Sequence, residues 1–195
     1  MFRIITVLIT VFVSCLLCGG EFSLLLNEEY ALVKNGKDSY RFNLHPLPPA
    51  NAQLMIRNGK KSEYLSAEIM TSSPVPESVL PAPYHIMPSM GQVNINVLEN
   101  SAKSIVLEIE YFLTAWGNKH GTPLMTRKMF GFGRIFGKYT FTKGTPGVKA
   151  EISARCLNRA PFKVDRLIVQ FPGVKKVAGP IVLDAGKSLS VTLDI

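Results

Sequence analysis

The residues with the most evident chemistry are three soft metal donors, His85, Met87 and Met90. Neutral imidazole and thioether groups are ligands that suit Cu(I). In an extended segment His85 and Met87 point the same way, whereas Met90 needs a turn at Pro88 to join them. Other methionines and histidines could add ligands: Met55, Met70, Met125, Met129, His45 and His120. A copper site is one interpretation; the alternative is methionines that fill gaps in a β core beside an exposed histidine.

A second group combines positive charge with aromatic rings. It consists of Arg127, Lys128, Phe130, Phe132, Arg134, Phe136 and Lys138. If residues 134–141 form a strand, Ile135, Tyr139 and Phe141 face the core. Phe136 then lies on the outer face between two cations. Cations attract anionic groups and rings insert or stack, a combination that serves membrane surfaces, acidic glycans and nucleic acid alike. We expect a protein, an anionic glycan or a membrane surface as the partner, because an exported protein makes nucleic acid the least expected of these. The alternative is an ordinary strand face bearing lysine and arginine, with Phe136 covered by a neighbouring loop.

Catalytic motifs are not found in the sequence. Gly186, Lys187 and Ser188 resemble the end of a phosphate-binding loop, but Ile181 stands where that motif requires glycine. The sequence has no Gly-x-Ser-x-Gly elbow and no His-Glu-x-x-His pair. We therefore expect a non-catalytic protein with no cofactor. An enzyme whose site forms only in the fold is the alternative.

The N-terminal residues have the three parts of a secretory signal peptide. Arg3 precedes an apolar run over residues 4–17, and small residues follow at Cys18, Gly19 and Gly20. The run is shorter than the roughly 20 residues that span a bilayer. We predict a signal peptide over residues 1–20 and a secreted, periplasmic or cell-envelope protein without a transmembrane segment after cleavage. A retained anchor and a lipidated Cys15 are the alternatives.

The positive charge is concentrated in one part of the chain. The formal net charge is +8, and residues 111–150 hold seven cations and no acidic residue. Such asymmetry bears on partners more than on the fold. It predicts a positive strip that overlaps the basic aromatic segment. Only Cys156 lies outside the leader, so the mature domain would rely on its core rather than on an internal disulfide.

Alternation of apolar and polar residues predicts strands along the whole chain. It is clearest over residues 92–97, 104–113, 148–156 and 189–195. Asn35-Gly36 and Asn58-Gly59 predict tight hairpins. Half-buried strands need a second layer to cover their apolar faces. We therefore predict an all-β fold, a two-layer antiparallel β-sandwich of immunoglobulin-like or jelly-roll type with about ten strands.

A proline-rich segment interrupts this pattern. Residues 72–91 hold five prolines, and proline cannot donate to a central ladder. We expect a loop within a single domain over residues 21–195, or else a linker between two small β units. Residues 158–195 resemble the closing strands of immunoglobulin-like domains in the order of strand, proline-containing connection, turn and alternating terminal strand. The resemblance concerns the fold and implies no activity.

Overall fold

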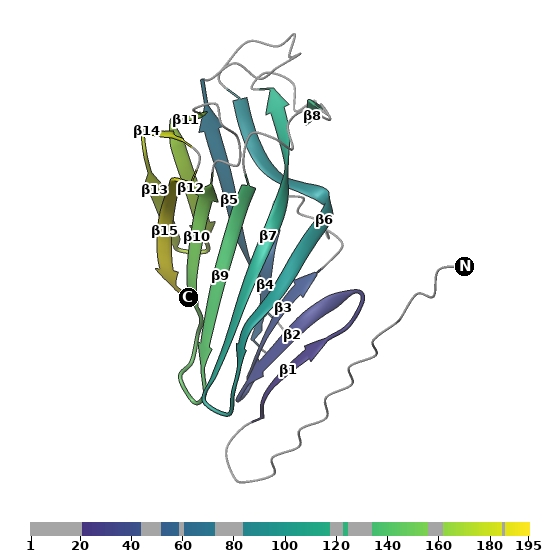
Figure 1. Cartoon of the computed structure of the whole chain (residues 1–195). Coiled ribbons are helices and arrows are strands. Elements are labelled where there is room, and N and C mark those ends of the chain that lie inside the picture. The colour runs from purple at the N-terminus through teal and green to yellow at the C-terminus, as the bar shows by residue number, and fades with distance from the viewer. Residues whose placement is uncertain are drawn as a thin grey trace, which may run out of the picture.

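In the described part of this chain the regular structure is β-strand (Figure 1). The computed structural model describes residues 21–43, 52–58, 61–72, 84–117, 123–124, 134–155, 162–184 and 186–195. Within those ranges no helix is long and apolar enough to cross a membrane. The strands are β1 (Phe22–Leu26), β2 (Tyr30–Asn35), β3 (Asp38–Asn43), β4 (Ala52–Asn58), β5 (Lys61–Thr71), β6 (Tyr84–Asn100), β7 (Ser104–Gly117), β8 (Pro123–Leu124), β9 (Arg134–Thr142), β10 (Lys149–Arg155), β11 (Phe162–Val164), β12 (Arg166–Phe171), β13 (Val174–Ala178), β14 (Ile181–Leu183) and β15 (Ser188–Asp194).

One 13-stranded sheet contains most of these strands, in the order β1-β2-β3-β4-β5-β6-β7-β9-β10-β15. β12 pairs with β5, β13 with β12 and β8 with β7, while β11 and β14 form a separate two-stranded sheet. β5 pairs with β12 along residues 66–70, which overlaps its pairing with both β4 and β6. β4 and β6 therefore share the other edge of β5, one after the other. At β5 the sheet thus branches, because β12 lies along one edge of this strand and β4 and β6 lie along the other. The described strands form the predicted all-β, antiparallel, sandwich-like fold.

Aromatic side chains of β3 and β9 fill the space between the layers. The ring centroids of Tyr40 and Phe141 are 4.9 Å apart, and those of Phe42 and Tyr139 are 4.7 Å apart. The phenol of Tyr40 also accepts a hydrogen bond from the Gly147 N–H at 3.0 Å. Burial raises the pKa of Tyr40, and the nearby Asp38 carboxylate raises it further. β3 and β9 thus form the centre of the core.

The inward face of β9 agrees with the alternation in its sequence. Ile135, Tyr139 and Phe141 are fully buried, as predicted. Phe136 and Lys138 lie on the other face, where Phe136 is half-buried and Lys138 is exposed. The strand and the side to which each residue points are therefore both confirmed.

The two predicted hairpins are also present. Asn35 pairs with Asp38 at the end of the β2–β3 ladder, and Gly36 adopts a φ of 66° in the loop between them. Glycine enters this left-handed region without steric cost. Asn58 pairs with Lys61 at the end of the β4–β5 ladder. Asn35 therefore closes its ladder rather than occupying the loop.

The proline-rich segment is partly strand, which corrects the expectation of a loop over residues 72–91. β6 begins at Tyr84, and its ladder with β5 ends at Ile86. Pro88 pairs with β7 alone, and the register with β7 shifts between Pro88 and Val93. A proline is tolerated beside such an irregularity because it interrupts little of the ladder. β6 bends sharply along its length (Figure 1), and residues 73–83 lie outside the described residues.

Candidate functional site

The described part of the basic aromatic segment lies on the outward face of β9, which is flanked by β7 and β10 (Figure 1). Register places Lys138 between Glu108 of β7 and Glu151 of β10. Phe136 lies two register pairs further along β9, and Arg155 lies two pairs beyond Phe136, at the end of β10. We call these five residues the outer β9 surface. Three neighbouring strands position it, so its backbone is held by ladders on both sides.

Arg155 is the cation of the outer β9 surface with side-chain contacts to both an aromatic ring and a carboxylate. Its guanidinium carbon lies 4.0 Å from the centroid of the Phe136 ring. Its Nη2 lies 3.2 Å from Oε2 of Glu108, and the Arg155 side chain keeps 42% of its surface exposed. A guanidinium has five N–H donors, and the contact with Glu108 engages Nη2. The ring and the carboxylate thus orient Arg155 while it remains accessible to an anion.

Phe136 differs from the expectation of a ring exposed between Arg134 and Lys138. It is half-buried and stacked against Arg155. Ser153, its partner in the β10 register, is only 6% exposed although it shares the outward face. The group that covers the Phe136 ring is the guanidinium of Arg155, which comes from the neighbouring strand β10 and not from a loop. This part of the surface is therefore packed rather than fully hydrated.

The described part of this face is also not uniformly positive. Glu108 and Glu151 lie in register on either side of Lys138. They fall just outside the acid-free window of residues 111–150. Neighbouring strands supply carboxylates that a count along one segment cannot include. The positive strip expected from the sequence is therefore interrupted here by acidic side chains.

The remaining predicted binding residues are placed only in part. Arg134 begins β9, and its register partner on β10 is Arg155. Arg127, Lys128, Phe130 and Phe132 lie outside the described residues. Arg155 itself was not among the predicted site residues, although its place on the polar face of β10 could have indicated it.

The predicted copper ligands lie on β6. Register places His85 opposite Met70 of β5. Met87 follows two residues later, and Met90 lies where the register with β7 shifts. In the described part of the chain, no group of three or more His, Cys, Asp and Glu residues is placed to hold a metal ion. The pairing of His85 with Met70 adds one thioether-bearing residue to the neighbourhood.

Glu108 and Glu110, the two acidic residues that share a face of β7, are both engaged. Glu108 contacts Arg155, and Oε2 of Glu110 accepts a hydrogen bond from Nδ2 of Asn94 at 3.0 Å. These contacts orient the carboxylates toward neighbouring strands. The geometry is suited to binding negative charge through Arg155 and Lys138.

Comparison with known proteins adds no identity: no family model, no curated protein and no solved structure matches the chain.

Proposed function

We propose that this chain is an exported, non-catalytic binding or assembly module that holds an anionic partner, a glycan or a lipid surface, at the outer β9 surface. The observation that carries the proposal is the guanidinium of Arg155 stacked on Phe136 at 4.0 Å. A guanidinium that is already stacked on a ring loses little conformational entropy when it forms a bidentate contact with an anion. Lys138 adds a second exposed cation on the same face.

Two further features support a binding role. The segment that leads into β9 brings Arg127 and Lys128 with Phe130 and Phe132 and has no acidic residue. Glu108 orients Arg155 through their ion pair. In this proposal Glu108 positions the cation that binds the anionic partner. Export is supported by the leader-like sequence of residues 1–20.

Binding of the purified chain to a sulfated glycan and to phosphatidylglycerol-containing vesicles tests the proposal. We expect binding to at least one of them, with an affinity that falls steeply as salt is raised, because exposed charges are screened. Lys138→Gln should weaken binding about two- to fivefold, the range of an exposed charge pair. Lys175→Gln removes an exposed lysine from β13, has the same effect on net charge, and should leave binding unchanged.

The stacked arginine gives a sharper comparison. Arg155→Lys keeps the charge but loses the planar group that stacks on Phe136. We expect this variant to bind more weakly than the parent chain despite its unchanged net charge. Two results together would show that binding depends on overall charge and not on this surface. They are equal losses of affinity in Lys138→Gln and Lys175→Gln, and an unchanged affinity in Arg155→Lys.

A copper-binding function is the second candidate, favoured by the register of His85 with Met70. Antiparallel partners have Cα atoms about 4.5–5.5 Å apart, and Met87 follows on the same strand. Titration with Cu(I) should then saturate, and His85→Ala should abolish the high-affinity site. Absence of saturable binding by the parent chain excludes this function.

A further inference from the structure

β1 is an open edge of the sheet. Among the described strands it pairs only with β2. Its five residues, FSLLL, carry no charge, and Leu25 and Leu26 are 50% and 49% exposed. Proteins commonly guard an edge of this kind with lysine, proline or a bulge, because its unpaired N–H and C=O groups can pair with another strand. β1 has none of these three features.

The backbone hydrogen bonds show which residues of β1 point outward along the edge. The Gly36 N–H donates to the Glu21 carbonyl at 3.0 Å, and the Asn27 N–H donates to the Tyr30 carbonyl at 3.0 Å. Hydrogen-bonded pairs alternate along an antiparallel ladder, so the odd-numbered residues of β1 bond to β2. The even-numbered residues, Phe22, Leu24 and Leu26, therefore direct their N–H and C=O groups away from β2.

The same three residues face the core. Their partners on β2 are Asn35, Val33 and Ala31, and all three partners are buried. Phe22 and Leu24 pack against the core, whereas Leu26 remains 49% exposed. An added strand would thus extend both the ladder and the apolar inner face.

The edge strand β13 of the same sheet provides a contrast, and lies on the other side of the molecule (Figure 1). It carries Lys175 and Lys176. The Nζ of Lys176 donates to the Thr192 carbonyl of β15 at 2.6 Å, which ties β13 to the other layer. Lysines in an edge strand oppose strand addition. β13 is therefore guarded in a way that β1 is not.

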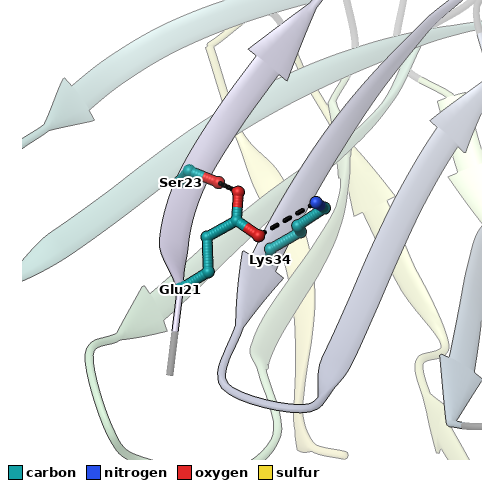
Figure 2. A network of polar contacts seen from close by, with 3 residues as sticks. All are labelled: Glu21, Ser23 and Lys34. Atoms are coloured by element: carbon teal, nitrogen blue, oxygen red, sulfur yellow. Dashed lines mark hydrogen bonds and ion pairs between the residues drawn. The ribbon is translucent and has the colours of Figure 1, made fainter. Parts of the chain in front are cut away.

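The charge beside β1 is neutralised on the outward face. Figure 2 shows Oε2 of Glu21 paired with Nζ of Lys34 at 2.9 Å, and Ser23 donating to Oε1 of Glu21 at 3.1 Å. The hydrogen bonds from Lys34 and Ser23 lower the pKa of the Glu21 carboxyl group. Glu21 is thus ionised and paired at neutral pH. It does not present an uncompensated charge to an approaching strand.

We propose that β1 pairs with β1 of a second copy of this chain in an antiparallel, two-fold arrangement that joins two sheets into one. The arrangement places Leu24 opposite the second copy's Leu24, and Phe22 opposite the second copy's Leu26. In this two-fold register all three residues whose N–H and C=O groups point away from β2 find a partner in the second copy. Each of the three pairs exchanges two main-chain hydrogen bonds, which gives about six in total. Exposed Leu26 then packs beside a second Phe22, and Glu21 faces Asn27 rather than another carboxylate. This self-pairing is independent of the anionic partner proposed above.

Sedimentation velocity over micromolar to millimolar concentrations tests the pairing, on the full chain with its N-terminus determined by mass spectrometry. We expect a concentration-dependent equilibrium between monomer and dimer. Leu24→Pro removes an N–H that points away from β2, so the β1–β2 ladder keeps its hydrogen bonds. This variant should associate about tenfold more weakly, the effect of losing bonds worth about 1–2 kcal/mol.

Val177→Lys is the matched control, because Val177 is 52% exposed on β13, another edge strand of the sheet. It should associate like the parent chain. Leu26→Lys, which places a charge in the β1 edge, should weaken association as Leu24→Pro does, and circular dichroism should show that both variants are folded. A parent chain that stays monomeric, or a folded Leu24→Pro variant that dimerises like the parent, overturns the proposal. Dimers weakened by Val177→Lys instead would assign the interface to β13.

Discussion

Asn35 shows how much a single polar residue contributes to this fold. Its Nδ2 donates to the carbonyls of Thr142 and Thr145 at 3.0 and 2.8 Å, and its Oδ1 accepts from the Gly144 N–H at 3.2 Å. It fastens the β9–β10 loop to the β2–β3 hairpin. The Asn-Gly pair predicted the hairpin correctly. Its long-range contacts could not be predicted, because the partners lie more than a hundred residues away in the chain.

Replacing Asn35 should therefore destabilise the whole domain. Asn35→Ala removes three hydrogen bonds and leaves backbone groups of the loop without their partner. We expect the free energy of unfolding to fall by about 2–4 kcal/mol, measured by urea denaturation. Asn96→Ala, at an exposed position of β6, should cost less than about 0.5 kcal/mol. Equal losses in the two variants would contradict the role assigned to Asn35.

The candidate site illustrates the same limit at the scale of residues. Alternation correctly predicted that Phe136 and Lys138 share the outer face of β9. It could not identify Arg155 as the group that covers Phe136, or Glu108 and Glu151 as the acidic neighbours of Lys138. These contacts depend on which strands lie beside β9. Local sequence predicts the face of a residue but not its cross-strand neighbours.

At the scale of elements, β9 depends on a glycine that faces the core. Gly137 pairs with Ile109 of β7 and Ile152 of β10. A Cβ at this position would lie 2.6 Å from Cε2 of Tyr139. Tyr139 is fully buried and packs on Phe42, so its ring has little room to move. A glycine inside a strand often marks such a close approach.

Gly137→Ala should displace the Tyr139 ring and strain the core. We predict a loss of about 1–3 kcal/mol in the free energy of unfolding, as for other overpacked cores, with a lower midpoint of thermal denaturation. Lys138→Ala changes the adjacent, exposed residue and should have little effect. The interpretation is wrong if Gly137→Ala is as stable as the parent chain.

The strands themselves were the most predictable elements, because each half-buried strand repeats its pattern every two residues. The shortest ones, β8, β11 and β14, have two or three residues, too few for an alternation to be recognised. These three strands account for part of the difference between the roughly ten strands predicted and the fifteen in the described residues. Residues 84–91 were missed for another reason: prolines argue against a strand, but Pro88 lies where the ladder is already irregular.

At the scale of the whole molecule, the fold class followed from the need to cover half-buried strands, and the described residues form such a fold. The order of strands did not follow, because pairing between distant segments leaves no local pattern. The position at which β5 changes partner from β4 to β6 is one example. The proposed function depends on this order, since the order brings Arg155 beside Phe136.

The central claim is that an anionic partner binds at the outer β9 surface. Chemical-shift mapping of the isotope-labelled chain tests it most directly, in a titration with the anionic glycan or the anionic detergent micelles that bind the chain. The proposal predicts that the largest shifts fall on backbone amides of β9 and the end of β10, around Phe136, Lys138 and Arg155. Shifts that fall mainly on β13, which carries Lys175 and Lys176, would contradict it.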